Sequence, residues 1–383
     1  MKKSVIVLGS TGSVGRQVLE VIEKEKEHFN IVGLTARSNL ELLQKQIDLF
    51  SPQAVALVDR EKAKKLVTAG KRIKIYGGAE GITEIVKSLP ADLVFSCIVG
   101  KAALIPTLEA IRADKDVALA NKESMVIAGD ILKKEAKKRN VSLIPVDSEE
   151  VAIFQCLKGN SINDIKRIYL TASGGPLYKW KGDFNKITPE QALSHPRWRM
   201  GQKISLDSAT LANKALEVIE TSRFFEVKVE KIRVLIHPQA IVHSLVEFID
   251  GSILSQLGVT DMRLPIHYAL NYSYRRGSYL PSLSLTQLEK ISFEAPDFQK
   301  FPALRLGYQA GEKGGTLPAV FNAADEVAGE SFLKGEITFT QIIYFVEEVM
   351  KRHKIIYNPS LEEILNADEE ARRITCELMK DIK

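Results

Sequence analysis

Short apolar runs alternate with longer amphipathic segments over the first 150 residues. The runs are rich in Val, Ile and Leu, as buried parallel strands are, and the segments between them repeat their apolar positions at helical spacing. The predicted strands are Ser4–Leu8, Ile31–Thr35, Ala54–Val58, Lys74–Tyr76, Leu93–Ser96, Val117–Leu119 and Leu143–Val146. The predicted helices are Gly15–Lys24, Leu40–Phe50, Glu61–Ala69, Ala102–Ala113 and Gly129–Arg139. We therefore predict an α/β fold with a Rossmann-like, doubly wound parallel sheet over residues 1–150.

The pattern changes at about residue 165, where longer strands cluster. They are predicted at Ile165–Ser173, Lys231–Ile236, Ser244–Phe248 and Ser252–Leu257. Asp250-Gly251 is a strong hairpin-turn signal between the last two. One helix, about Ser208–Thr221, lies among the strands. Residues 151–280 are thus predicted to form a central α+β domain with a mixed or antiparallel sheet, and we expect the catalytic groups there.

The last hundred residues are helical in pattern. Residues 281–301 are weakly periodic and contain Pro and Ser, so we interpret them as a linker. Helices are predicted at about 302–311, 318–333, 339–353 and 360–380, with Ser360 as an N-cap. Residues 302–383 are therefore predicted to form a helical C-terminal domain.

Composition narrows the class of protein. The 383 residues are 45% hydrophobic and 26% charged, and no apolar run is long enough to span a membrane. The N-terminal residues enter a strand directly, so we expect no signal peptide. Three scattered cysteines fit a reducing cytoplasm. A net charge of +5, spread along the chain, favours anionic small molecules and gives no support for nucleic-acid binding.

A glycine-rich turn follows the first strand. Gly9, Gly12 and Gly15 give the spacing G-x-x-G-x-x-G between a strand and a helix, which is typical of a pyrophosphate site at a helix N-terminus. Packing of the helix on the strand is the alternative role. The second strand ends in Arg37 and Ser38 without an acidic residue, which favours the 2′-phosphate of NADP(H) over the free ribose of NAD. A solvent-facing Arg37 is the alternative.

Two carboxylates, Asp147 and Glu149, follow an apolar run. On a strand their i, i+2 spacing would point both to one face, where they would repel each other unless a cation or a shared proton lies between them. Oxygen ligands of this kind suit Mg²⁺ or Mn²⁺. We therefore predict a divalent metal site here.

Four further polar clusters are candidates for chemistry. Residues 120–123 follow a strand, so Lys122 would lie at the edge where such sheets bind ligands; a surface turn is the alternative. Residues 170–176 end a strand with Ser and two Gly, as in an anion-binding nest or a hairpin. Residues 195–201 combine His and Trp on an aperiodic stretch. They form either a lid over the site or a loop that a buried Trp holds in place. Asn213, Lys214 and Glu217 share one helix edge, where an ordinary surface pair is the alternative.

Taken together, these segments resemble the 1-deoxy-D-xylulose 5-phosphate reductoisomerase family of the non-mevalonate isoprenoid pathway. The similar segments, in family order, are GSTGSVG at 9–15, ANKE at 120–123, PVDSE at 145–149, LTASGGP at 170–176, HPRWRMG at 195–201, KISLDSATLANKALEV at 203–218, IHPQAIVHSLVEF at 236–248, DGSILSQLG at 250–258, DMRLPIHYAL at 261–270 and NAADE at 322–326.

The resemblance implies conversion of 1-deoxy-D-xylulose 5-phosphate, a phosphorylated sugar, to 2-C-methyl-D-erythritol 4-phosphate with NADPH and one divalent ion (Mg²⁺, Mn²⁺ or Co²⁺). It implies a homodimer and a flap at about 185–201. The implied metal ligands are Asp147, Glu149 and Glu217. The implied substrate contacts are Lys122, Ser148, Glu149, Ser173, His195, Trp198, Met200, Ser208, Asn213, Lys214 and Glu217; of these, Lys122 and His195 join the metal ligands as catalytic residues. The implied NADPH contacts are Thr11, Gly12, Ser13, Val14, Arg37, Ser38, Asn39, Asn121, Glu123 and Gly201.

Some positions depart from the family pattern. Glu150 stands where the family usually has His, Ala36 and Ser38 where Gly and Lys are common, and Asp325 where Asn is usual. An added carboxylate at Glu150 would alter local pKa values or metal preference.

Two other functions fit parts of the sequence. An NADP-dependent semialdehyde or acyl-phosphate dehydrogenase opens with a similar glycine pattern but needs a nucleophilic Cys, for which Cys97 is the only placed candidate. A non-catalytic NADP(H)-sensing protein would bind the cofactor without turnover or metal dependence.

Overall fold

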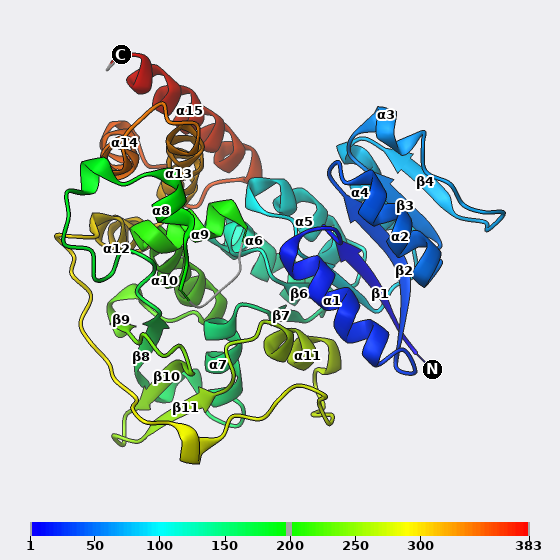
Figure 1. Cartoon of the computed structure of the whole chain (residues 1–383), viewed down its shortest axis with the longest axis horizontal. Helices are drawn as coiled ribbons and strands as arrows, with labels where there is room; N and C mark the ends of the chain where they lie inside the picture. Colours follow the sequence, from blue (N-terminus) through cyan, green and yellow to red (C-terminus); the bar gives the residue numbers. More distant parts are fainter. Residues whose placement is uncertain (1, 197–200, 382–383) are drawn as a thin grey trace. The chain divides into compact units, whose positions relative to one another are not determined.

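The computed structural model describes residues 2–196 and 201–381. The chain divides into two compact units. Unit 1 consists of Met1–Ser124, Asp130–Val151 and Asp261–Pro281, and unit 2 of Met125–Gly129, Ala152–Thr260 and Ser282–Lys383. Figure 1 labels most of their helices and strands.

Unit 1 is built on a seven-stranded sheet with the order β4-β3-β2-β1-β5-β6-β7. Every pairing in the sheet is parallel. Its strands are β1 Lys3–Leu8, β2 Phe29–Ala36, β3 Ala54–Leu57, β4 Lys74–Gly77, β5 Leu93–Ser96, β6 Asp116–Leu119 and β7 Leu143–Pro145. The chain reverses its direction of winding beside β1, and such a reversal creates the crevice that binds nucleotides in open α/β sheets. The predicted parallel sheet is confirmed.

Helices connect these strands. They are α1 Ser13–Lys24, α2 Leu40–Phe50, α3 Arg60–Ala63, α4 Ala79–Ser88, the 3₁₀ turn η1 Gly100–Ala103, α5 Leu104–Arg112, α6 Lys122–Arg139 and, after β7, α7 Ser148–Cys156. The central strands are apolar on both faces: on β1, the successive residues Val5, Ile6 and Val7 are fully buried. Continuous burial of this kind explains why these strands are apolar at every position rather than at alternate ones.

One later segment also belongs to unit 1. Helix α11, Arg263–Asn271, lies beside α1 (Figure 1). His267 Nε2 lies 2.8 Å from a Glu25 carboxylate oxygen, and Asn271 donates to the other oxygen at 3.1 Å. The predicted assignment of residues 261–280 to the central domain is therefore wrong, because helical periodicity does not indicate which sheet a helix covers.

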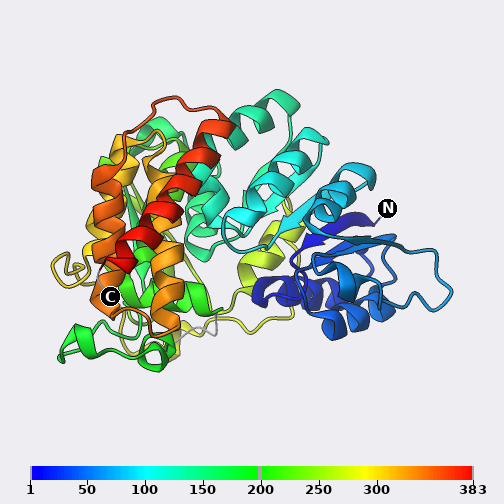
Figure 2. The same cartoon turned by 90° about the horizontal axis from the view of Figure 1, so that it is seen from above.

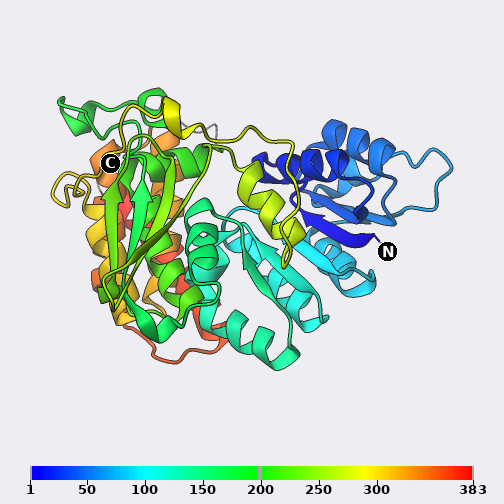
Figure 3. The same cartoon turned by 90° about the horizontal axis from the view of Figure 1, so that it is seen from below.

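Unit 2 contains a four-stranded mixed sheet with the order β11-β10-β8-β9 (Figure 3). Its strands are β8 Ile165–Ala172, β9 Ile232–Ile236, β10 Val242–Phe248 and β11 Ile253–Leu257. β8 and β9 are parallel, whereas β10 is antiparallel to both β8 and β11. Gly251 adopts a φ of +89° in the β10–β11 turn, which confirms the predicted hairpin.

Helices complete unit 2. They are α8 Pro189–Leu193, α9 Gln202–Thr210, α10 Ala212–Phe225, α12 Pro302–Lys313, α13 Leu317–Leu333, α14 Phe339–Arg352 and α15 Leu361–Lys380, with 3₁₀ turns η2 Ile162–Asp164, η3 Phe184–Lys186, η4 Val229–Lys231 and η5 Leu285–Gln287. α13, α14 and α15 lie side by side (Figure 2). Ser360 caps α15 with a reciprocal Glu363 contact, so the predicted N-cap is confirmed.

The predicted helix at 208–221 is wrong, because two helices meet there. α9 ends at Thr210, Leu211 has a left-handed φ of +59°, and α10 begins at Ala212. The Thr210 hydroxyl contacts the Asp207 carbonyl and accepts from the Ala212 amide at 3.2 Å each. A side chain that competes for backbone partners in this way interrupts a helix.

Candidate active site

The glycine turn after β1 has the geometry of a nucleotide loop. Gly9 has a φ of +76°, and a Cβ there would lie 2.9 Å from the Cys97 carbonyl oxygen. A Cβ on Gly15 would lie 2.3 Å from the Gly9 oxygen. Glycine is therefore required at both positions. Gly9 needs it for its backbone conformation, and Gly15 needs it because α1 approaches the turn closely. Gly12 is the N-cap of α1. Backbone N–H groups consequently face the place where a pyrophosphate would bind.

Residues from β2 and α2 hold this turn. The Thr35 hydroxyl accepts from the Gly9 amide at 2.9 Å. Ser10 is fully buried and exchanges two hydrogen bonds with the Gln46 side chain, at 2.7 and 2.9 Å. The sequence gives no sign of these partners, because they lie 25 residues or more from the turn.

The loop after β2 carries the predicted selectivity residues. Arg37 and Ser38 are exposed, and no acidic side chain ends the strand. Asn39 caps α2 by accepting from the Leu42 amide at 3.1 Å. Asn39, a predicted cofactor contact, thus also has a structural role.

The segment after β6 begins helix α6 rather than forming a surface turn. Asn121 is its N-cap and accepts from the Ser124 amide at 2.8 Å. The Asn121 amide group donates to Glu123 at 2.7 Å, and both side chains are buried. Helix α6 therefore starts seven residues before the predicted helix at Gly129, and a kink at Ala128 separates the two parts. The fixed position of this turn places Lys122 at the carboxyl end of the sheet.

The carboxylates Asp147 and Glu149 do not share a strand, so that part of the prediction is wrong. β7 ends at Pro145, the Asp147 carbonyl accepts from Val151 at 2.8 Å, and Glu149 lies in the first turn of α7. Acidic side chains are favourable in the first turn of a helix because of the helix dipole, which favours a helix start at this position.

Lys122 and Asp147 form an ion pair of 2.6 Å in unit 1. Both side chains are largely buried. Burial raises the pKa of Asp147, and the Lys122 ammonium opposes this shift. Ser148 donates to Glu149 at 2.6 Å, and Glu150 is fully buried. The segment 147–150 therefore carries three carboxylates, and one of them, Asp147, pairs with the Lys122 ammonium.

In unit 2, β8 ends in a backbone nest. Gly174 and Gly175 have φ values of +89° and +68°, and the Gly175 amide donates to the Ser173 hydroxyl at 3.3 Å. A Cβ on Gly175 would lie 2.3 Å from the Ser208 carbonyl oxygen, so this turn packs directly on α9. The hairpin alternative is wrong, because no described strand follows until β9, which runs parallel to β8. Consecutive left-handed residues of this kind present N–H groups to an anion.

His195 lies at this nest. Its Nε2 is 3.0 Å from the Ser173 hydroxyl, and burial lowers the pKa of His195 to about 4. The imidazole is therefore neutral at physiological pH and exchanges a hydrogen bond with the serine.

Helix α10 carries three further polar residues of the predicted site, Asn213, Lys214 and Glu217. Lys214 is 3% exposed and donates to the Thr171 carbonyl at 2.6 Å. It also pairs with Glu217, which accepts from Asn213 at 2.5 Å and is 2% exposed. The surface-pair alternative is thus wrong, because both charges are buried. A buried ion pair with additional hydrogen bonds holds its members in one geometry.

The predicted site residues fall into two sets. Unit 1 carries the cofactor turn, Lys122, Asp147 and Glu149, and unit 2 carries Ser173, His195, Ser208, Asn213, Lys214 and Glu217. Ser208 lies in the last turn of α9 rather than starting a helix, and Gly201 is the N-cap of α9. Trp198 and Met200 lie outside the described residues.

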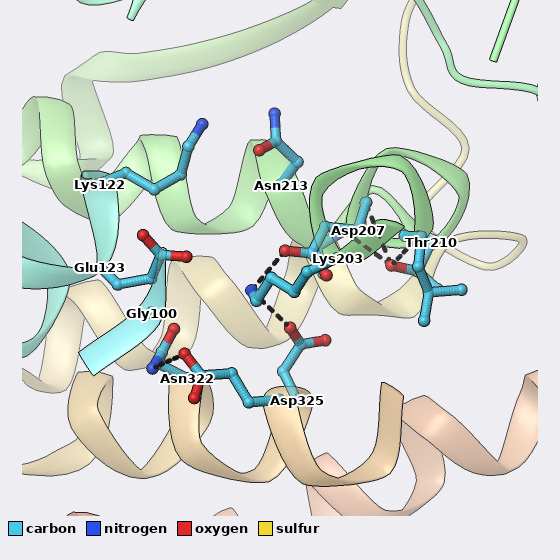
Figure 4. Close-up of polar contacts among 12 residues, drawn as sticks. Gly100, Lys122, Glu123, Lys203, Asp207, Thr210, Asn213, Asn322 and Asp325 are labelled. Atoms are coloured by element: carbon cyan, nitrogen blue, oxygen red, sulfur yellow. Dashed lines mark hydrogen bonds and ion pairs between the residues drawn. The ribbon is translucent and has the colours of Figure 1, made fainter. Parts of the chain in front are cut away.

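A buried cluster beside this nest was missed by sequence reasoning. Lys203 and Asp207 on α9 form an ion pair of 2.5 Å, and Lys203 also lies 3.3 Å from Asp325 on α13 (Figure 4). Burial, and then the charge of Asp325, raise the pKa of Asp207 to about 7. Two buried acids thus share one ammonium, and Asp207 changes between its protonated and ionised forms near neutral pH. Only the fold brings residues 207 and 325 together.

This cluster predicts a pH-dependent stability. Asp207 binds a proton more tightly in the folded chain than in the unfolded one, so the stability that this group contributes is fully present below about pH 4 and is lost as the pH rises through about 7. Asp325→Asn leaves Asp207 as the one acid beside the Lys203 ammonium and removes the repulsion between the two carboxylates. It should therefore raise the free energy of unfolding at pH 8 by about 2 kcal/mol. Thermal unfolding midpoints at pH 5, 6, 7 and 8 measure this contribution.

Asp207→Asn is the matched variant, because it also leaves one acid beside Lys203. Both variants should flatten the pH dependence by a similar amount. An Asp325→Asn protein that keeps the wild-type slope would show that the two acids do not share a proton.

Sequence models of one family match most of the chain. The 1-deoxy-D-xylulose 5-phosphate reductoisomerase model matches residues 5–129. Two C-terminal domain models of the same family match residues 143–225 and 257–374.

Relatives and solved structures agree with this result. The chain is 51% identical to the 1-deoxy-D-xylulose 5-phosphate reductoisomerase of Thermoanaerobacter sp. strain X514 over 375 residues, 97% of each chain. It is 47% identical to that of Thermodesulfovibrio yellowstonii, over 97% of this chain and 98% of the relative. The Zymomonas mobilis enzyme in complex with NADPH has a TM-score of 0.92 at 39% identity, covering 99% of both chains. A solved DOX-P reductoisomerase in complex with NADPH, fosmidomycin and magnesium also has a TM-score of 0.92, at 37% identity, covering 99% of this chain and 98% of the other. The chain belongs to the 1-deoxy-D-xylulose 5-phosphate reductoisomerase family.

Proposed function

We propose that this protein rearranges and reduces 1-deoxy-D-xylulose 5-phosphate to 2-C-methyl-D-erythritol 4-phosphate, with NADPH and one divalent metal ion, in isoprenoid precursor biosynthesis. The observation that carries the proposal is the buried Asp147–Lys122 pair at the carboxyl end of a dinucleotide-type sheet, in a chain that matches this family over nearly its whole length. The Zymomonas mobilis relative binds NADPH, and other relatives bind magnesium.

The metal ligands in this proposal are Asp147, Glu149 and Glu217. Three carboxylates are the donor set that Mg²⁺ and Mn²⁺ prefer, so the residues present fit such an ion. When bound, the ion supplies a Lewis acid for the oxygens of the substrate. The chain's own part is to hold the ligands: Ser148 orients Glu149, and Asn213 and Lys214 orient Glu217. Such supporting contacts commonly tune metal affinity by about 10–100-fold.

The cofactor groups in this proposal surround the first glycine turn. The close approaches at Gly9 and Gly15 leave backbone amides for a pyrophosphate, and Arg37 with Ser38 suits a 2′-phosphate. NADPH, when bound, supplies the hydride. The other proposed contacts are Thr11, Gly12, Ser13, Val14, Asn39, Asn121, Glu123 and Gly201.

The substrate phosphate would bind to Ser173, Ser208, Asn213 and Lys214. Lys214 supplies the cation, and the glycine nest supplies N–H donors. His195 is neutral, so it can exchange a hydrogen bond with the substrate without adding a charge beside the phosphate. Binding at the phosphate, away from the reacting carbons, supplies energy for positioning them.

The assembly and location belong to the proposal as well. Family resemblance supports a homodimer, and the scattered cysteines support a cytoplasmic location. Within the described residues no helix is both long and apolar enough to cross a membrane. Sedimentation of the purified protein would measure the oligomeric state.

A thiol-dependent dehydrogenase is disfavoured. Cys97 is buried, and burial raises the pKa of its thiol far above the normal value. A catalytic cysteine needs the opposite shift, because the thiolate is the nucleophile.

Metal removal tests the function directly. NADPH oxidation in the presence of deoxyxylulose phosphate should stop when a chelator is added and return with Mn²⁺, because the ion polarises the substrate oxygens. Absorbance at 340 nm follows the reaction. Thiol alkylation should leave the rate unchanged, since the two buried cysteines are protected. Metal-independent turnover that alkylation abolishes would instead support the dehydrogenase.

A further inference from the structure

A second cation lies beside the Arg37–Ser38 loop. Lys62 on α3 donates from its Nζ to the Ser38 carbonyl at 3.0 Å. Its side chain is 45% exposed, so the ammonium is held by the protein and still open to solvent. Lys62 and Ser38 are 24 residues apart, and no sequence motif connects them.

The sheet explains why these residues meet. β3 is the parallel neighbour of β2, so the carboxyl ends of both strands lie at the same edge. The loop after β3 is tied to the loop after β2 by two backbone bonds, from Val58 to the Ala36 carbonyl and from Asp59 to the Arg37 carbonyl, both 3.0 Å. Asp59 then caps α3 by accepting from the Lys62 amide at 3.1 Å. This arrangement aims the Lys62 side chain back over Ser38.

The local charges favour an anion. Arg37 and Lys62 are cationic, and Asp59 is the nearest acid, with a carboxylate oxygen 3.8 Å from the Lys62 ammonium. The neighbouring Arg60 pairs with Glu80, and Lys64 pairs with Glu61, so these cations are compensated by acids outside the loop. Ser38 brings a hydroxyl without a charge. An ammonium has three N–H donors, and one of them is given to Ser38.

We propose that Lys62 is a specificity-determining residue that binds the 2′-phosphate of NADPH together with Arg37 and Ser38. The inference deepens the proposed function, on which it rests for the position of the cofactor. NADH has a hydroxyl in place of this phosphate, so Lys62 distinguishes the two cofactors by charge.

Cofactor binding without substrate tests the proposal. Dissociation constants of NADPH and NADH are measured by fluorescence titration for the wild type, Lys62→Ala and Lys62→Arg. Lys62→Ala should weaken NADPH binding roughly tenfold and leave NADH binding unchanged, because only the 2′-phosphate contact is lost. Lys62→Arg keeps the charge and should retain most of the affinity. Lys64→Ala, on the same segment and 71% exposed, is the matched control and should change neither constant.

The outcomes separate this inference from the cofactor assignment itself. Arg37→Ala serves as the reference variant and should also weaken NADPH binding selectively. If Arg37→Ala has this effect and Lys62→Ala does not, the role of Lys62 is overturned while the cofactor assignment stands. If the wild type binds NADH as tightly as NADPH, the cofactor assignment itself fails. Equal loss of both cofactors in Lys62→Ala would indicate a structural role and would also overturn the proposal.

Discussion

Glu217→Gln should lower kcat on the order of 10³-fold, about 4 kcal/mol of barrier, while leaving NADPH binding nearly intact. Glutamine has the shape of glutamate and can still accept from Asn213, so the loss would come from the missing anionic ligand. Steady-state kinetics with Mn²⁺ measures kcat. The Mn²⁺-induced rise in the thermal unfolding midpoint should disappear as well, because ligands stabilise only the states that bind them.

The control for this substitution is Glu230→Gln. Glu230 lies in the same unit, is exposed and pairs only loosely with Lys228 at 3.7 Å, so its loss should have no effect on either readout. Glu217→Asp keeps the charge but shortens the side chain, and should give an intermediate rate. Wild-type turnover in Glu217→Gln would remove Glu217 from the metal site.

Lys214→Gln should raise KM for the substrate on the order of 100-fold, which corresponds to about 2.7 kcal/mol and is within the range for a charge-assisted hydrogen bond. The Lys214 ammonium is buried and fixed between the Thr171 carbonyl and Glu217, so it is already oriented before an anion binds. Initial rates over a range of substrate concentrations give KM, and fluorescence titration gives the NADPH dissociation constant, which should not change.

Lys231→Gln is the matched control for Lys214. Lys231 also donates to a carbonyl of β8 at 2.6 Å, but to Ile165 at the opposite end of the strand. Its replacement removes a similar structural hydrogen bond without touching the nest. Equal KM changes in both variants would mean that Lys214 acts through strand stability rather than on phosphate.

The alternation of apolar runs and amphipathic segments was sufficient to predict the parallel sheet. Strands that are buried on both faces are apolar at nearly every position, and such runs are visible in the sequence without knowledge of tertiary contacts. Helix ends were less predictable. Thr210 is an ordinary residue in sequence, and it interrupts the helix only through its side-chain hydrogen bonds.

The site was predicted only in part, because some of its features are local in sequence and others depend on tertiary packing. The glycine turn could be identified because its residues are consecutive and each is required by local geometry. The spacing of Asp147 and Glu149 correctly indicated a carboxylate cluster but gave the wrong local structure, since the strand ends before it. Contacts such as Lys62 with Ser38 and Lys203 with Asp325 depend on tertiary packing, and no local pattern reports them.

The central claim is that Glu217 binds one metal ion together with Asp147 and Glu149. An anomalous difference map, recorded at the manganese absorption edge from crystals grown with Mn²⁺, tests it most directly. The account predicts one strong peak with an oxygen of each of the three carboxylates at coordination distance, about 2.0–2.3 Å. A peak bound elsewhere, or one that Glu217 does not contact, would contradict it.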